Sequence, residues 1–155
     1  MPVLDQIVAL LTAEGIEFRR LDHAPTRTSE ESAAVRGEPL AVGAKAILLK
    51  ADDTFSLFIL PADKQLDSGA IKRRLGAKKT RFATPEELLE LTTLVPGSVP
   101  PFGRPILEFD LYADVDVGSH ENRVAFNAGS LTTSVIMPAT DWERLAKPVR
   151  FAFAK

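Results

Sequence analysis

Cysteine is absent from the 155 residues of this chain. Its absence excludes a disulfide framework, a thiolate nucleophile and a zinc site built on cysteine. Histidine is scarce as well, since the chain holds only His23 and His120, which are far apart and in different contexts. No paired-histidine motif of the HExxH kind occurs, so we expect no catalytic metal.

Long apolar runs and nucleotide-binding motifs are also missing. No segment approaches the ~20 apolar residues that a membrane span requires, and the N-terminus lacks the basic and apolar regions of a signal peptide. The sequence contains no phosphate-binding loop, no GxGxxG motif and no GxSxG nucleophile elbow. We therefore expect a cytoplasmic protein that makes no membrane contact and uses no cofactor.

Neither sign of charge is in large excess, because the net charge is −2 at pH 7. Hydrophobic residues make up 45% of the chain and charged residues 26%, which are ordinary values for a globular protein. The length suits one domain with its own core, so we expect residues 1–155 to form a single domain. A nucleic-acid partner would need a local basic patch.

The predicted helices and strands do not alternate strictly. Apolar periodicity and capping signals predict helices near residues 4–15, 28–37, 68–75, 84–92 and from 140 onward. Strands are predicted at 16–21, 44–51, 54–60, 106–112, 124–127, 133–137 and 149–153. Capping boxes are expected at Thr28 with Glu31 and at Thr84 with Glu87, and Thr140 with Glu143 is expected to cap the last helix. This order favours an α+β fold, a mixed sheet with helices packed around it, over a doubly wound fold.

Lys45 is the first candidate for a functional side chain. It begins the strand predicted over 44–51 and shares a face with Ile47 and Leu49. If that face is inward, the ammonium lies at the mouth of an apolar interior, where an unpaired charge is costly and needs a partner or a chemical role. Alternatively, the strand end is solvated and the side chain extends to water.

Two glycine-containing segments are candidates for close approach to a ligand. Residues 94–103 contain three prolines and two glycines, and free backbone N–H groups there could face a carbonyl oxygen or a phosphate. Residues 126–130 follow a predicted strand and combine glycine with small side chains. A rigid connector and a plain turn, respectively, would explain the same patterns.

A local basic patch does occur. Residues 68–85 contain six lysines and arginines and no acid, and the four that we expect to contact the phosphates of a nucleic acid are Arg73, Arg74, Lys78 and Lys79. A solvated helix face would give the same pattern.

Several short motifs, taken in order, resemble the YbaK/prolyl-tRNA-synthetase-associated editing family. They are His23-Ala-Pro25 before a helix that begins at Thr28, Gly43-Ala-Lys45-Ala-Ile-Leu-Leu, Leu60-Pro-Ala-Asp63, Gly97-Ser-Val-Pro-Pro-Phe-Gly103 and Phe126-Asn-Ala-Gly129. The similarity runs from His23 to the last helix and rests on the order and spacing of the motifs. It implies a compact mixed β-sheet, partly barrel-like, with surrounding helices.

The resemblance also implies a reaction. Freestanding members hydrolyse, in trans, the ester that joins a wrong amino acid to the 3′ end of a tRNA. Lys45 matches the family's near-invariant lysine and would hold the terminal phosphate or the carbonyl oxygen. Backbone N–H groups of Gly97, Ser98 and Gly129 would stabilise the oxyanion while a water, assisted by the terminal ribose hydroxyl, attacks without a protein nucleophile. The expected substrate-binding residues are His23, Thr28, Pro101, Phe102, Asn127 and Ser130.

We expect the pocket to accept a small amino acid, namely alanine, serine or threonine, with Asn127 and Ser130 placed to hydrogen-bond a hydroxyl. The expected partners are the aminoacylated 3′ end of a tRNA and an aminoacyl-tRNA synthetase. Ala46 stands where the family often has Thr or Ser, and Asn127 stands where alanine-clearing members have a histidine, so the amino acid stays open. Two alternatives remain: a non-catalytic tRNA- or synthetase-binding module of the same fold, and a hydrolase of another small acyl ester.

Overall fold

The computed structural model describes residues 1–155, whose strands form two open sheets. The three-stranded sheet has the order β1–β7–β6, and the five-stranded sheet has the order β4–β2–β3–β5–β8. The strands are β1 (Arg19–Asp22), β2 (Ala44–Ala51), β3 (Thr54–Pro61), β4 (Thr80–Phe82), β5 (Leu111–Ala113), β6 (Arg123–Asn127), β7 (Thr133–Pro138) and β8 (Val149–Arg150). Pairing is antiparallel in the first sheet, whereas the β3–β5 and β5–β8 pairs of the second are parallel. The mixed α+β class is therefore confirmed. Neither sheet closes into a barrel, although an isolated parallel bridge between Gly43 and Ala125 joins them.

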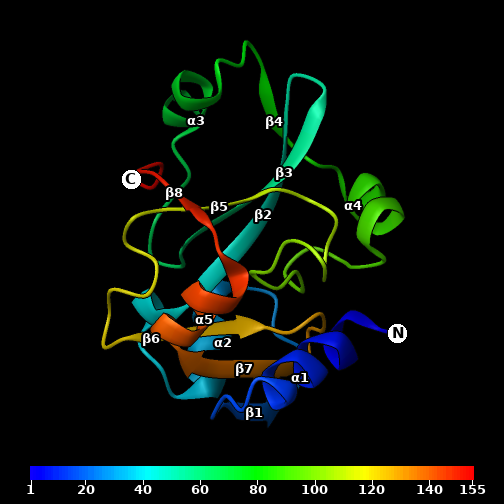
Figure 1. The fold of residues 1–155 in the computed structure, drawn as a ribbon, viewed down its shortest axis with the longest axis vertical. Coiled ribbons are helices and arrows are strands. Elements are labelled where there is room, and N and C mark those ends of the chain that lie inside the picture. The colour runs from blue at the N-terminus through cyan, green and yellow to red at the C-terminus, as the bar shows by residue number, and fades with distance from the viewer.

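Five α-helices surround these sheets. They are α1 (Val3–Ala13), α2 (Ser29–Arg36), α3 (Ser68–Leu75), α4 (Pro85–Thr92) and α5 (Ala139–Ala146), and a single 3₁₀ turn occupies Leu40–Val42. In Figure 1 the three-stranded sheet lies in the lower half with α1, α2 and α5, and the long β2–β3 hairpin rises from it between α3 and α4. None of the helices combines the length and the apolar character that spanning a membrane would require.

The β2–β3 hairpin has buried side chains on both of its faces, so it belongs to two hydrophobic clusters of the protein. On one face Ala44 and Leu48 join the main core, which also contains the fully buried Trp142 of α5. On the other face Leu49 joins a smaller cluster with Phe153 near the C-terminus. The hairpin prediction is confirmed. Lys45 lies on the same face as Leu49. It is near the start of β2, a strand with side chains packed into a core on each of its two faces.

Local hydrogen bonds cap the first turns of the helices, and the sequence predicts some of these bonds but not all. Thr84 and Glu87 form the complete predicted capping box. Thr28 caps α2 by accepting from the Glu31 N–H at 3.1 Å, but the Glu31 carboxylate accepts from the N–H of Arg27 instead of that of Thr28. The predicted Thr140 cap is wrong, because β7 runs straight into α5 at Pro138. The Asn122 side chain accepts from the Thr140 N–H there.

Four strands differ from the predicted ones. The first was expected at 16–21, but β1 begins only at Arg19. The strand expected at 106–112 is only β5, because the preceding residues form local turns such as Leu107 N–H to Gly103 O and Phe109 N–H to Leu107 O. The strand expected at 149–153 is limited to β8. Strand β4 was not predicted, since its three residues follow the cationic stretch and become a strand only by pairing with the end of β2.

Candidate functional site

A cavity of about 240 Å³ opens where α2, the start of β2, the end of β6 and the loop at 97–99 meet. None of its lining side chains is a carboxylate, an imidazole or a thiol, and three are cationic, namely Arg27, Arg36 and Lys45. The other lining residues are mostly small, with alanine or glycine at seven positions. The cavity therefore offers a positive potential and little room, which suits a small, oxygen-rich group.

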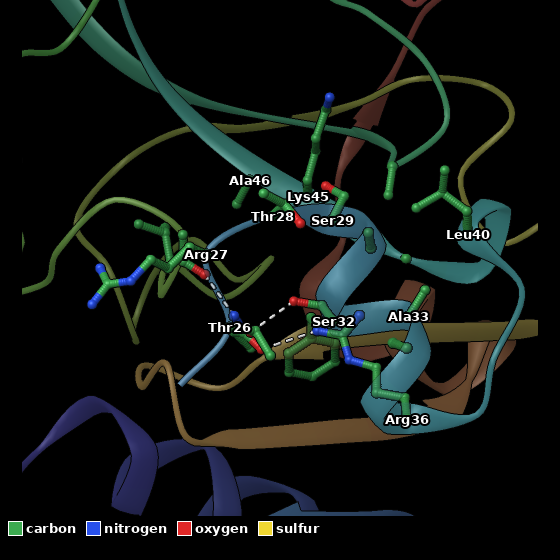
Figure 2. Close-up of a pocket in the computed structure, with 18 of the residues that line it drawn as sticks. Thr26, Arg27, Thr28, Ser29, Ser32, Ala33, Arg36, Leu40, Lys45 and Ala46 are labelled. Atoms are coloured by element: carbon green, nitrogen blue, oxygen red, sulfur yellow. Dashed lines mark hydrogen bonds between the residues drawn. The ribbon is translucent and has the colours of Figure 1, made fainter. Parts of the chain in front are cut away.

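Lys45 lies at the wall of this cavity and is half-buried. Its ammonium makes no hydrogen bond or ion pair with the protein. Figure 2 shows the side chain extending away from Thr26, Ser32 and Arg36, whereas Arg27 extends in another direction. The Lys45 charge is thus available to a ligand that enters the cavity.

The proline-rich loop contributes backbone to the same cavity. Gly97 and Val99 both line it, and neither of their N–H groups donates a hydrogen bond within the protein. Ser98, which is 2% exposed, closes the loop instead, because its hydroxyl donates to Val95 O at 2.8 Å and its own N–H donates to the same oxygen. The loop therefore contributes to the cavity wall two residues with unpaired backbone N–H groups, whereas its serine hydroxyl is used within the loop.

Asn127, at the end of β6, joins this loop to α2. Its Nδ2 donates to Gly97 O at 2.8 Å, and its Oδ1 accepts from Arg36 Nη2 at 3.0 Å. The Ser134 hydroxyl lies 3.1 Å from the same Oδ1. Asn127 lines the cavity, but most of its hydrogen-bonding capacity is used by the protein.

Arg36 is a site residue that the sequence did not indicate. It is 8% exposed, and its Nε donates to Ser134 Oγ at 2.9 Å. Burial lowers the pKa of the Arg36 guanidinium to about 10, against the opposing charge of Glu38, so the group stays protonated at neutral pH. An arginine before a helix-ending glycine is an ordinary C-terminal pattern, and only the fold turns this one inward.

His23 and Thr28 lie on either side of the same network. Thr28 lines the cavity as the cap of α2. His23 lies behind it, with Nδ1 2.8 Å from Ala24 O and Nε2 2.8 Å from Ser134 Oγ. Because a carbonyl only accepts, Nδ1 carries a proton, and Nε2 shares a hydrogen bond with the Ser134 hydroxyl. His23 thus contacts the cavity residues through Ser134.

The other predicted site residues do not line the cavity. Pro101 and Phe102 belong to the packing beneath it, where Pro101 O accepts from Trp142 Nε1 at 2.8 Å and Phe102 is 2% exposed. The Gly129 N–H donates to Ser98 O at 2.9 Å, and a Cβ at Gly129 would lie 3.0 Å from Val3. Ser130 accepts from the Thr132 N–H in an exposed turn.

The predicted basic patch is exposed and lies away from the cavity. Its four residues, Arg73, Arg74, Lys78 and Lys79, are exposed and form no ion pair, and Arg74 lies over the Phe151 ring at 5.4 Å. The Asp52 carboxylate accepts from the backbone N–H groups of Lys78 and Lys79, which fixes their place beside the β2–β3 turn. Because β2 separates that turn from Lys45, Lys78 and Lys79 are about 20 Å from the cavity.

Arg81, which is also in the cationic stretch, is engaged elsewhere. Its guanidinium donates to both carboxylate oxygens of Glu87, at 2.7 and 2.9 Å. These bonds, with the Thr84 N–H, lower the pKa of Glu87 to about 2. Arg81 therefore fixes β4 to the start of α4 and does not belong to the free cations of the patch.

Several known proteins are similar to this chain in sequence or in fold. The family model described as the aminoacyl-tRNA editing domain matches residues 23–145. The multifunctional Ser/Thr-tRNA deacylase ProXp-y of Escherichia coli (strain K12) is 36% identical over 148 residues, which cover 92% of this chain and 87% of that protein.

Two further similarities concern proline. A proline–tRNA ligase of Bacillus pumilus is 32% identical over 116 residues, which are 73% of this chain but only 20% of the ligase. A solved structure of a candidate trans-editing enzyme for prolyl tRNA synthetase superposes with a TM-score of 0.83 at 25% identity, covering 100% of this chain and 98% of the other. The chain belongs to the aminoacyl-tRNA editing domain family.

Proposed function

We propose that the protein is a trans-editing hydrolase, which deacylates mischarged aminoacyl-tRNA that bears a small amino acid. The observation that carries the proposal is the cavity of about 240 Å³, which is lined by Lys45 and by Gly97 and Val99, two residues with unpaired backbone N–H groups. The similarity to a Ser/Thr-tRNA deacylase over most of both chains supports the same reaction.

The proposed mechanism uses no protein nucleophile. A water, assisted by the terminal ribose hydroxyl, attacks the ester carbonyl, and the tetrahedral intermediate then expels the ribose oxygen, which takes up a proton. The free N–H groups of Gly97 and Val99 are the proposed oxyanion donors, and each such donor contributes about 3 kcal/mol in other hydrolases. Lys45 supplies a positive charge to the carbonyl oxygen or the terminal phosphate.

The size of the cavity supports a small amino acid. Ala33, Gly43 and Ala46 line it, and a Cβ at Gly43 would lie only 2.8 Å from Ala62 Cβ, so the wall is closely packed there. Alanine, serine and threonine are the proposed substrates. A larger side chain would have to displace backbone or buried residues, at a cost that small editing pockets use for discrimination.

The tRNA is proposed to extend beyond the cavity to the basic patch. Lys78 and Lys79 are about 20 Å from Lys45. None of the four patch residues lines the cavity, so the patch is suited to phosphates farther along the tRNA. An aminoacyl-tRNA synthetase is a proposed second partner, because the family includes segments of proline–tRNA ligases. Since aminoacyl-tRNA is made and used in the cytoplasm, the proposed reaction belongs to that compartment.

A deacylation panel tests the proposal. The protein is mixed with tRNA charged with alanine, serine, threonine or a large residue such as phenylalanine, and release of the amino acid is followed over time. We expect hydrolysis of at least one small aminoacyl ester and none of the phenylalanyl ester. Tight tRNA binding without hydrolysis of any ester would replace the enzyme by a binding module, and equal hydrolysis of free aminoacyl esters would indicate a general esterase.

A further inference from the structure

Arg36 is the most buried of the three cations that line the cavity. It is 8% exposed, whereas Arg27 is exposed and Lys45 is half-buried. Its neighbours Thr26 and Ser32 are buried too, at 3% and 7% exposure. In Figure 2 these three residues lie together on one side of the cavity, and Lys45 and Arg27 extend away from them. The cavity thus has a deep polar end and a cationic rim.

The guanidinium fork of Arg36, formed by Nε, Nη1 and Nη2, has N–H donors that the protein leaves unused. A guanidinium has five N–H donors. Nε donates to Ser134 Oγ and Nη2 donates to Asn127 Oδ1, at 2.9 and 3.0 Å. Nη1 donates to no protein atom, and it lies 3.8 Å from the position that a Cβ at Gly43 would take. Arg36 and Gly43 both line the cavity, so Nη1 lies beside its wall.

The Arg36 charge also lacks a carboxylate in contact. Glu38, the acid whose charge acts on Arg36, is bound to Arg123 at 2.7 Å and lies 3.7 Å from Arg19. No buried side-chain nitrogen or oxygen lacks a hydrogen-bond partner, so Nη1, which has none, stays accessible. The deep end therefore offers a charged donor to an oxygen acceptor that the protein itself does not provide.

The connectivity of the substrate decides which oxygen reaches this end. The phosphate and the ribose are attached to the rest of the tRNA and stay at the rim, so only the amino-acid side chain can extend inward. The Asn127 amide is held by Arg36 and by Gly97 O, and Ser130 is outside the cavity. The free donors of the deep end are then Arg36 Nη1 and the Thr26 hydroxyl, which accepts from Ser32 and has its own proton unused.

We propose that Arg36 determines specificity by donating from Nη1 to the side-chain hydroxyl of a serine or threonine on the tRNA. Asn127 and Ser134 hold the fork in place, and Thr26 is the second donor. This inference rests on the proposed function and assigns the substrate class of its site. Alanine fits the same space but makes no hydrogen bond to Nη1, so it gains less from this end of the cavity.

Arg36→Met removes the donors and keeps most of the side-chain length. We expect kcat/KM for Ser-tRNA to fall about 10- to 100-fold relative to Ala-tRNA, the size associated with a hydrogen bond to a charged group. Arg27→Met is the matched control, because it removes an exposed cation from the same cavity and should change both substrates alike. An unchanged serine-to-alanine ratio in folded Arg36→Met would overturn the inference.

A measurement on the wild-type protein covers the case in which Arg36→Met does not fold. The ¹⁵N–¹H signal of Arg36 Nε is followed by NMR during titration with adenosine that carries serine or alanine through a non-hydrolysable 3′ amide. We expect a larger shift with the seryl compound, and equal shifts would overturn the inference. If wild-type protein hydrolyses no mischarged tRNA, the proposed function fails, and this titration still decides whether the hydroxyl subsite exists.

Discussion

Replacing Lys45 by methionine separates the catalytic charge from the fold. The ammonium forms no hydrogen bond or ion pair with the protein, and the methionine keeps the apolar part of the half-buried stem. We therefore expect the free energy of unfolding to change by less than about 0.5 kcal/mol, as for surface substitutions without a special partner. Hydrolysis should fall sharply, because the positive charge at the cavity is removed.

The size of that fall follows from where Lys45 lies. A unit charge about 4 Å from a developing negative charge contributes about 1 kcal/mol in bulk water and about 4 kcal/mol at an effective dielectric constant of 20. A half-buried side chain lies between these limits. The expected loss in kcat/KM is therefore between roughly 5-fold and 1,000-fold. Single-turnover deacylation, with unfolding followed in urea, measures both quantities.

Lys50→Met is the matched control for this experiment. Lys50 is the other lysine of β2, is also half-buried, and lies over the Phe55 ring at 5.6 Å, far from the cavity. Its removal should lower stability by about 0.5 kcal/mol or slightly more and leave hydrolysis unchanged. If folded Lys45→Met hydrolyses its substrate as fast as Lys50→Met does, the role given to the Lys45 charge is wrong.

Three other outcomes are expected. Glutamate at all four patch positions, Arg73, Arg74, Lys78 and Lys79, should weaken tRNA binding. The slope of log K against log salt concentration should become shallower by about 0.7 to 0.9 for each phosphate that the protein no longer neutralises. An unchanged slope would mean that the patch is only a solvated face. Glu87 has a folded pKa near 2, below its ordinary 4.5, so its contribution to stability is complete above about pH 4.5 and disappears as pH falls toward 2. Unfolding of wild type and Glu87→Gln across that range should converge at the acid end. Gly103→Ala should destabilise the protein by about 1–3 kcal/mol in urea unfolding, because its Cβ would lie 2.7 Å from Phe109 O.

Local signals explain how much of the fold could be predicted. The Thr84 box and the Thr28 cap act within one turn of helix, so their residues alone determine them. The β2–β3 hairpin is similarly local, since a two-residue turn joins two apolar runs. Strand β4 and the shortened β5 depend on partners far along the chain, and neither has a pattern of its own.

For the candidate site too, some residues could be predicted from local motifs and others depend on the fold. Lys45, Gly97 and Asn127 stand in motifs whose order resembles a family, and all three line one cavity. Pro101 and Phe102 stand in such a motif too but pack beneath the cavity, because a loop of a few residues has two sides and only its packing decides which one faces a ligand. A motif thus locates a segment, and the fold decides which atoms of it are available.

Arg36 is the opposite case, a cavity residue that no sequence motif indicated. Its place at the end of α2 suggests a solvated helix end, with the charge facing water and the helix dipole. The inward turn requires Ser134 on β7 and Asn127 on β6, about a hundred residues later, to supply two acceptors for the fork. Those acceptors compensate the guanidinium only in part, since Nη1 is left over. An incomplete network of this kind is not needed for folding, because an apolar residue would fill the space without a buried charge. The proposed serine or threonine hydroxyl completes the network when the substrate binds.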